Sequence, residues 1–68
     1  MQLTINGEAR SFDSPLTLAT LLEKLGLKQD RVAVEHNLNL ISRAQWESTA
    51  LTDGDRLEIV QFVGGGAY

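Results

Sequence analysis

The end of the sequence holds the residues best suited to chemistry. Three consecutive glycines, Gly64-Gly65-Gly66, are followed by Ala67-Tyr68. Glycine loses much conformational entropy on ordering and has no side chain to pack, so residues 64–68 are expected to form a flexible tail beyond a domain of residues 1–63. Most chain ends fray in this way, so the simplest interpretation of the tail is that it does nothing.

A chemical interpretation of the tail rests on its reach and on the small size of glycine. Three residues beyond Val63 extend about 10 Å, which is enough to enter the active site of another protein. A glycine-only segment can thread a narrow channel and leave a terminal carboxylate unhindered. Because a carboxylate is a poor acyl donor, chemistry at Gly66 would require activation by a partner, typically as an acyl-adenylate. Gly66 is therefore the candidate reactive residue, with Gly65 beside it.

The other polar residues offer little chemistry of their own. The chain has no cysteine, which excludes disulfides, thiolate metal sites and a catalytic thiol. The single histidine, His36, is more typical of a surface or turn residue than of a ligand or a base. Asp53 and Asp55 flank a glycine and favour a turn over a metal site, because two carboxylates without further ligands do not hold a cation. We expect no bound metal or cofactor.

Composition limits the possible partners. The formal net charge is −3, and the basic residues are scattered, which disfavours nucleic acid. No apolar run approaches the length of a membrane span, and no basic segment followed by an apolar block marks a signal peptide. A soluble protein of the cytoplasm is the expectation.

The first half of the chain predicts a hairpin and one helix. In residues 1–12, Leu3 and Ile5 alternate with polar residues, and Asn6-Gly7 suits the positive φ angles of a type I′ turn before a return strand over residues 9–12. Thr17 is a candidate N-cap, and Gly26 suits a left-handed helix end. Between them a stripe of leucines at helical spacing must be buried: Leu18, Leu21, Leu22 and Leu25.

The second half predicts short strands around one aromatic anchor. Residues 32–35 and 39–41 are expected to form strands, and Trp46 should anchor an irregular or single-turn segment over residues 43–49. After a turn at Asp53-Gly54-Asp55, residues 56–63 should form the longest strand. The predicted core consists of Leu3, Ile5, Leu18, Leu21, Leu22, Val32, Val34, Leu57 and Ile59.

This order of elements predicts an α+β fold of the ubiquitin-like β-grasp type. One main helix packed across one face of a mixed four- to five-stranded sheet buries both apolar surfaces with little chain. If Leu57 and Ile59 face the helix, Val60 and Phe62 lie on the opposite, uncovered face of the sheet. We therefore expect Val60 and Phe62, with Val63 and Gly64 next along the chain, to form a docking patch for partners.

The segment VAVEHNLNLISRAQWESTALTDGDRLEIVQFVGGG resembles the second half of the ThiS family, the sulfur carriers of thiamine biosynthesis in the ThiS/MoaD superfamily. The resemblance includes the strand before Asn37, Ile41 and Arg43, the Asp53-Gly54-Asp55 turn and the ending FVGGG. It extends more loosely over the first half, so that it covers the chain as far as Gly66. A glycine pair alone is weak evidence, but a glycine pair that closes a β-grasp pattern is strong evidence.

The resemblance implies a protein co-substrate and not an enzyme. Gly66 would be adenylated by an ATP-dependent enzyme similar to ubiquitin activators (ThiF type), and a sulfur donor protein would help convert it to a thiocarboxylate. That thiocarboxylate would deliver sulfur to a thiazole synthase (ThiG type) that builds the thiazole ring of thiamine. The absence of cysteine agrees with this chemistry, because the sulfur is carried on the acyl carbon.

The chain departs from the family pattern where it continues with Ala67-Tyr68 after the glycines. A partner shaped for glycine should not activate a tyrosine carboxylate, so we expect a precursor that is trimmed after Gly66, by analogy with carriers cut by a metalloprotease. Such extensions also occur in related carriers, which leaves sulfur delivery for cysteine, homocysteine or molybdopterin synthesis as an alternative. A non-covalent β-grasp interaction module and a protein modifier joined through Gly66 to lysines are further alternatives.

Overall fold

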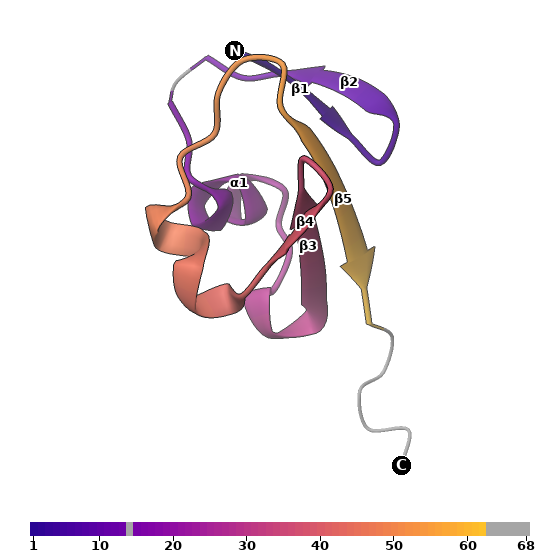
Figure 1. Ribbon diagram of the computed structural model, residues 1–68, viewed down its shortest axis with the longest axis vertical. Coiled ribbons are helices and arrows are strands. Elements are labelled where there is room, and N and C mark those ends of the chain that lie inside the picture. The colour runs from indigo at the N-terminus through magenta and orange to yellow at the C-terminus, as the bar shows by residue number, and fades with distance from the viewer. Residues whose placement is uncertain (14, 63–68) are drawn as a thin grey trace.

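The structure is a computed structural model that describes residues 1–13 and 15–62 (Figure 1). Residues 63–66, which carry four of the six predicted site positions, lie outside the described residues. Within the described part, the strands are β1 (Gln2–Ile5), β2 (Glu8–Ser11), β3 (Val32–His36), β4 (Asn39–Ile41) and β5 (Arg56–Gln61). The helices are α1 (Leu18–Lys24) and two short 3₁₀ helices, η1 (Gln29–Arg31) and η2 (Arg43–Ser48).

The predicted β1–β2 hairpin is confirmed. Asn6 and Gly7 both have positive φ angles, 50° and 83°, as a type I′ turn requires. The return strand starts at Glu8, one residue earlier than the pattern predicted. The Asn6 side chain also holds the hairpin to β5, because its Oδ1 accepts from the Ile59 amide at 2.7 Å and its Nδ2 donates to the Ile59 carbonyl at 3.1 Å.

Helix α1 begins and ends at the predicted residues. The hydroxyl of Thr17 accepts from the amide of Thr20 at 3.2 Å, and the hydroxyl of Thr20 accepts from the amide of Thr17 at 2.8 Å. This reciprocal capping box satisfies two amides that would otherwise lack partners at the helix start. Gly26, with a φ of 74°, follows the last turn and ends the helix in the left-handed conformation.

The five strands form one mixed sheet in the order β2-β1-β5-β3-β4. Strand β5 is central: it pairs parallel with β1 and antiparallel with β3, although β1 and β5 come from opposite ends of the chain. Helix α1 lies on one side of this sheet, as Figure 1 shows. A single helix across one face of a mixed sheet is the β-grasp arrangement, so the predicted fold class is confirmed.

The core lies between α1 and the sheet, and all nine predicted core residues are buried. Trp46, the predicted anchor of η2, is only 2% exposed, and its indole Nε1 donates to the Ile41 carbonyl at 2.9 Å. Leu16 and Leu51 were not predicted to be in the core. They are buried because the segments before α1 and after η2 meet, with the Leu51 amide donating to the Leu16 carbonyl at 2.8 Å. No helix in residues 1–13 and 15–62 is long and apolar enough to cross a membrane.

Candidate functional site

The two predicted docking residues that the structure describes lie on the uncovered side of the sheet. Val60 is 57% exposed and Phe62 is 53% exposed, while Leu57 and Ile59 face the helix. Strand β5 ends at Gln61 and not at Val63 as predicted. The Phe62 amide still donates to the Arg31 carbonyl at 2.7 Å, which continues the pairing with β3 by one residue.

The sheet register places further side chains beside Val60. Ala33 of β3 is the cross-strand partner of Val60, and Glu35 lies between Leu40 of β4 and Glu58 of β5. Because side chains alternate between the two faces of a strand, these residues share the side that α1 does not cover. We call this surface the open face: Ala33, Glu35, Leu40, Glu58, Val60 and Phe62.

The open face carries an exposed apolar side chain that the sequence did not predict there, Leu40, which is 75% exposed. The alternation signal was too short to assign a face to Leu40, because β4 has three residues. A shallow hollow of about 70 Å³ lies between the strands on this side. It is lined by Ala33, Val34, Glu35, Leu40, Glu58 and Val60.

A buried carboxylate supports the start of β5. Asp55 is 8% exposed, and it accepts hydrogen bonds from the Thr52 amide and hydroxyl, the Asn37 amide group and His36 Nε2, at 2.8 to 3.1 Å. Burial alone would raise the pKa of Asp55, but the hydrogen bonds from His36, Thr52 and Asn37 outweigh burial and lower the pKa to about 2.

The role of this cluster is structural. Asp55 is the second aspartate of the predicted turn, and the turn is confirmed by Gly54 with a φ of 89°. His36 is not a turn residue: it is the last residue of β3 and reaches across 19 positions to Asp55. Together with the bond from the Arg56 amide to the Asn37 side chain at 2.9 Å, the contact joins the end of β3 to the beginning of β5. It aligns the strand that leads to the glycines.

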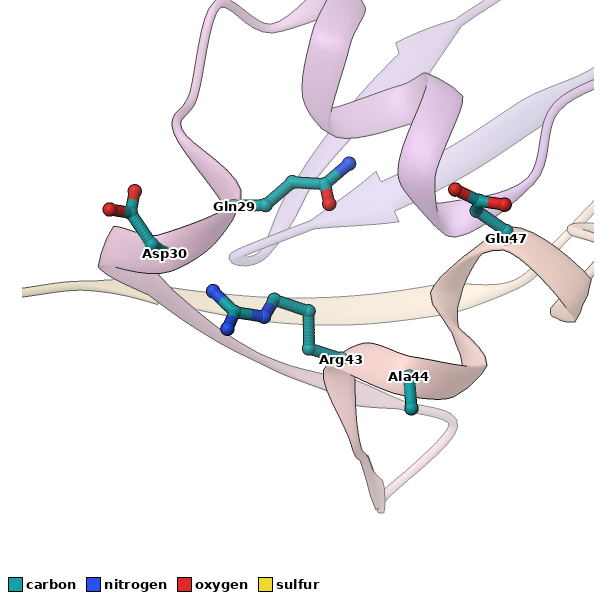
Figure 2. A pocket seen from close by; sticks show the side chains of 5 residues that line it. All are labelled: Gln29, Asp30, Arg43, Ala44 and Glu47. Atoms are coloured by element: carbon teal, nitrogen blue, oxygen red, sulfur yellow. The ribbon is translucent and has the colours of Figure 1, made fainter.

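A second hollow lies between η1 and η2 (Figure 2). Arg43 extends from η2 toward η1, where Asp30 is located, and Glu47 lies farther along η2. Asp30, Arg43 and Glu47 are exposed, and none of them belongs to the predicted site. In residues 1–13 and 15–62 no group of three or more histidine, aspartate or glutamate side chains is close enough to hold a metal ion.

Comparison with known proteins gives the family. The model of the ThiS family matches residues 3–66, which is nearly the whole chain and ends at the last glycine. The crystal structure of a thiamine biosynthesis protein, ThiS, from Geobacter metallireducens superposes with a TM-score of 0.83 at 36% sequence identity. The match covers 97% of this chain and 100% of that one.

Relatives fall into two size classes. The sulfur carrier protein ThiS of Escherichia coli is 32% identical over 66 residues, covering 97% of this chain and 100% of that protein. A thiazole synthase of Paramagnetospirillum magneticum is 46% identical over 67 residues, covering 98% of this chain. The chain spans only 21% of the length of that synthase and of a second one, from Magnetococcus marinus. By family match, by identity over full length and by fold, the chain belongs to the ThiS family of sulfur carrier proteins.

Proposed function

We propose that this chain is the sulfur carrier for thiazole formation in thiamine biosynthesis, with the Gly66 carboxylate as its working group. The observation that carries the proposal is the family match, which covers residues 3–66 and so includes Gly66. Two further observations support it: the Geobacter neighbour is a thiamine biosynthesis protein, and two relatives that contain a similar segment are thiazole synthases.

The proposed chemistry takes place at one acyl carbon. A carboxylate oxygen of Gly66 attacks the α-phosphorus of ATP on the adenylating partner, and pyrophosphate leaves. A sulfide equivalent from the sulfur donor protein then attacks the acyl carbon, and AMP leaves with the bonding electron pair. The product is a thiocarboxylate, whose sulfur the thiazole synthase uses. The chain supplies the acyl group and its partners supply the catalysis, so it needs no bound cofactor of its own.

The described part of the molecule supports this role with an exposed apolar surface on the strand that precedes the glycines in the sequence. Val60 and Phe62 are exposed, lie on the side of the sheet opposite α1 and directly precede Val63 and Gly64 in the chain. A partner that binds the open face would therefore find the glycines within reach of its active site. We propose the adenylating enzyme and the thiazole synthase as the proteins that bind there.

Ala67-Tyr68 must be removed before activation in this scheme. Gly66 is followed by Ala67-Tyr68, so its carbonyl lies in a peptide bond to Ala67 and Gly66 has no free carboxylate. A channel shaped for glycine excludes the bulky side chain of Tyr68. We propose that a protease, by analogy a metalloprotease, cuts after Gly66.

Adenylation of a protein that ends at Gly66 tests the proposal. Pyrophosphate exchange with the ThiF-type enzyme should be rapid for that protein and slow for the chain that ends at Tyr68. Gly66→Val in the shortened protein should abolish exchange and leave the melting temperature unchanged, because a β-branched side chain crowds the acyl carbon. Intact mass should show a gain of about 16 Da when sulfur replaces oxygen at the carboxylate.

Two results would contradict the scheme. Equal exchange by the full-length chain, with no trimming visible by mass, would refute the precursor step. Exchange by neither form would refute the carrier role, and the apolar open face would then favour a non-covalent interaction module.

A further inference from the structure

Two carboxylates face each other on the open face. Glu35 of β3 and Glu58 of β5 are direct cross-strand partners, and both are exposed. Like charges at directly opposed positions of an antiparallel pair destabilise the sheet. Within residues 1–13 and 15–62 neither carboxylate forms an ion pair, since the one ion pair there joins His36 and Asp55.

None of the chain's own cations in residues 1–13 and 15–62 forms an ion pair with Glu35 or Glu58. Arg56 lies two positions before Glu58 on the same strand, and its cross-strand partner is Thr4 of β1. Arg31 lies beyond the start of β3, opposite Phe62. Both arginines are exposed, and neither is in an ion pair with Glu35 or Glu58 in the described part of the chain.

The surroundings of the two carboxylates are apolar. The hollow of about 70 Å³ includes Glu35 and Glu58. Leu40 is the cross-strand partner of Glu35, and the Ala33–Val60 pair lies two residues farther along the strands on the same face. The small side chain of Ala33 leaves the hollow open between the larger side chains of Leu40 and Val60. A slot with an apolar lining and two carboxylates suits a long side chain with an aliphatic stem and a cationic head.

We propose that the open face binds an arginine side chain of a partner protein, with its aliphatic stem in the hollow and its guanidinium between Glu35 and Glu58. Arginine fits better than lysine because its planar head carries five donors and can bond two carboxylates at once. A metal ion fits less well, because the described residues place no third ligand beside the pair. The inference rests on the proposed docking role of the open face and names the chemistry that the partner must present.

The first test measures partner binding by isosteric variants that remove one charge each. Glu35→Gln and Glu58→Gln should each weaken binding to the adenylating enzyme or the thiazole synthase about tenfold or more, because each substitution removes a charged acceptor of hydrogen bonds. Glu47→Gln, which removes an exposed carboxylate from η2, is the matched control and should bind as the wild type does. Added salt should weaken the wild type more than the double glutamine variant.

A stability measurement separates this role from a structural one. Each glutamine variant should melt at the wild-type temperature or above it, because the substitution relieves the repulsion between Glu35 and Glu58. Weaker binding together with a lower melting temperature would assign the carboxylates to the fold and overturn the inference. So would unchanged affinity of both variants for both enzymes.

A peptide probe makes the inference testable even if the carrier role fails. A blocked Leu-Arg-Leu peptide should shift the backbone amide NMR signals of Ala33, Glu35, Glu58 and Val60. The same peptide with citrulline, the neutral isostere of arginine, should shift them much less, and the double glutamine variant should not distinguish the two peptides. Equal shifts from both peptides on the wild type, or none from either, would overturn the inference, whatever the result of the adenylation assay.

Discussion

Asp55 is the residue whose environment differs most from what its place in the sequence predicts. An Asp-Gly-Asp turn is expected to be solvated, yet the Asp55 carboxylate is buried and accepts hydrogen bonds from three side chains and one amide. Neighbouring residues do not reveal this, because His36 and Asn37 are 19 and 18 positions away. A contact of that range depends on how β3 and β5 align, which no local pattern encodes.

Asp55 should make the protein sensitive to acid. Its pKa is about 2 in the folded protein and 3.8 as the ordinary value. Because the folded value is the lower one, the stabilisation is complete above about pH 4 and is lost as the pH falls toward 2. The free energy of unfolding should fall by about 2 kcal/mol over that window from this group alone.

Urea denaturation between pH 5 and 2 measures this effect. Asp55→Asn should be less stable at pH 5 and should lose less stability on acidification than the wild type. Asp30→Asn, an exposed substitution on η1, is the control and should follow the wild-type curve. Parallel curves for the wild type and Asp55→Asn would rule out the assignment to Asp55.

Helix α1 shows which elements local sequence signals can predict. Thr17 and Gly26 define its start and its end, and the structure confirms both. The leucine stripe defines its buried face: three of the four leucines are buried, while Leu25 lies just past the last helical residue and is only partly buried. The hairpin turn at Asn6-Gly7 was predictable for the same reason, since the residue types there have few alternative conformations. Leu16 and Leu51 belong to no helical or strand pattern of apolar residues. Their burial could not be predicted, because it depends on contact between the segment before α1 and the segment after η2.

The stability of the fold should depend strongly on this helix. Leu21 is fully buried in the core, so Leu21→Ala should lower the free energy of unfolding by about 2–5 kcal/mol through lost burial and the cavity left behind. Leu40→Ala, at a 75% exposed position, is the matched control and should change it by about 0.5 kcal/mol or less. Thermal or urea denaturation gives both values, and similar losses for both variants would contradict the packing described.

At the scale of the whole molecule, the sheet has one face buried against the helix and one exposed face, to which we assign the binding of partners. The helix-facing side holds the predicted core, and the open face holds Val60 and Phe62 at more than half exposure. This division was predictable because successive side chains of β5 point to opposite faces of the sheet. The acidic pair on the open face was not, because pairing Glu35 with Glu58 requires the register between β3 and β5.

Substitutions on the open face should therefore affect binding and not stability. Phe62→Ala and Val60→Asp should weaken binding to the adenylating enzyme about tenfold or more, because each removes exposed apolar area from the proposed contact. Ala44→Asp, at an exposed position on η2, introduces the same charge elsewhere and should bind normally. Calorimetric titration measures the affinities and thermal melting checks the fold. Unchanged affinity for both open-face variants would leave these side chains as ordinary surface.

The central position of β5 also determines when the protein can fold during its synthesis. The ribosome makes β1 first and β5 last, yet the two strands are neighbours, and Asn6 is bonded to Ile59 across 53 positions. Until β5 has been translated, β1 and β3 each present an unpaired edge, and long-range pairing of this kind is slow and open to aggregation. A chain whose translation stops before β5 should therefore be a target for degradation, so that only complete molecules reach the enzymes that would use them.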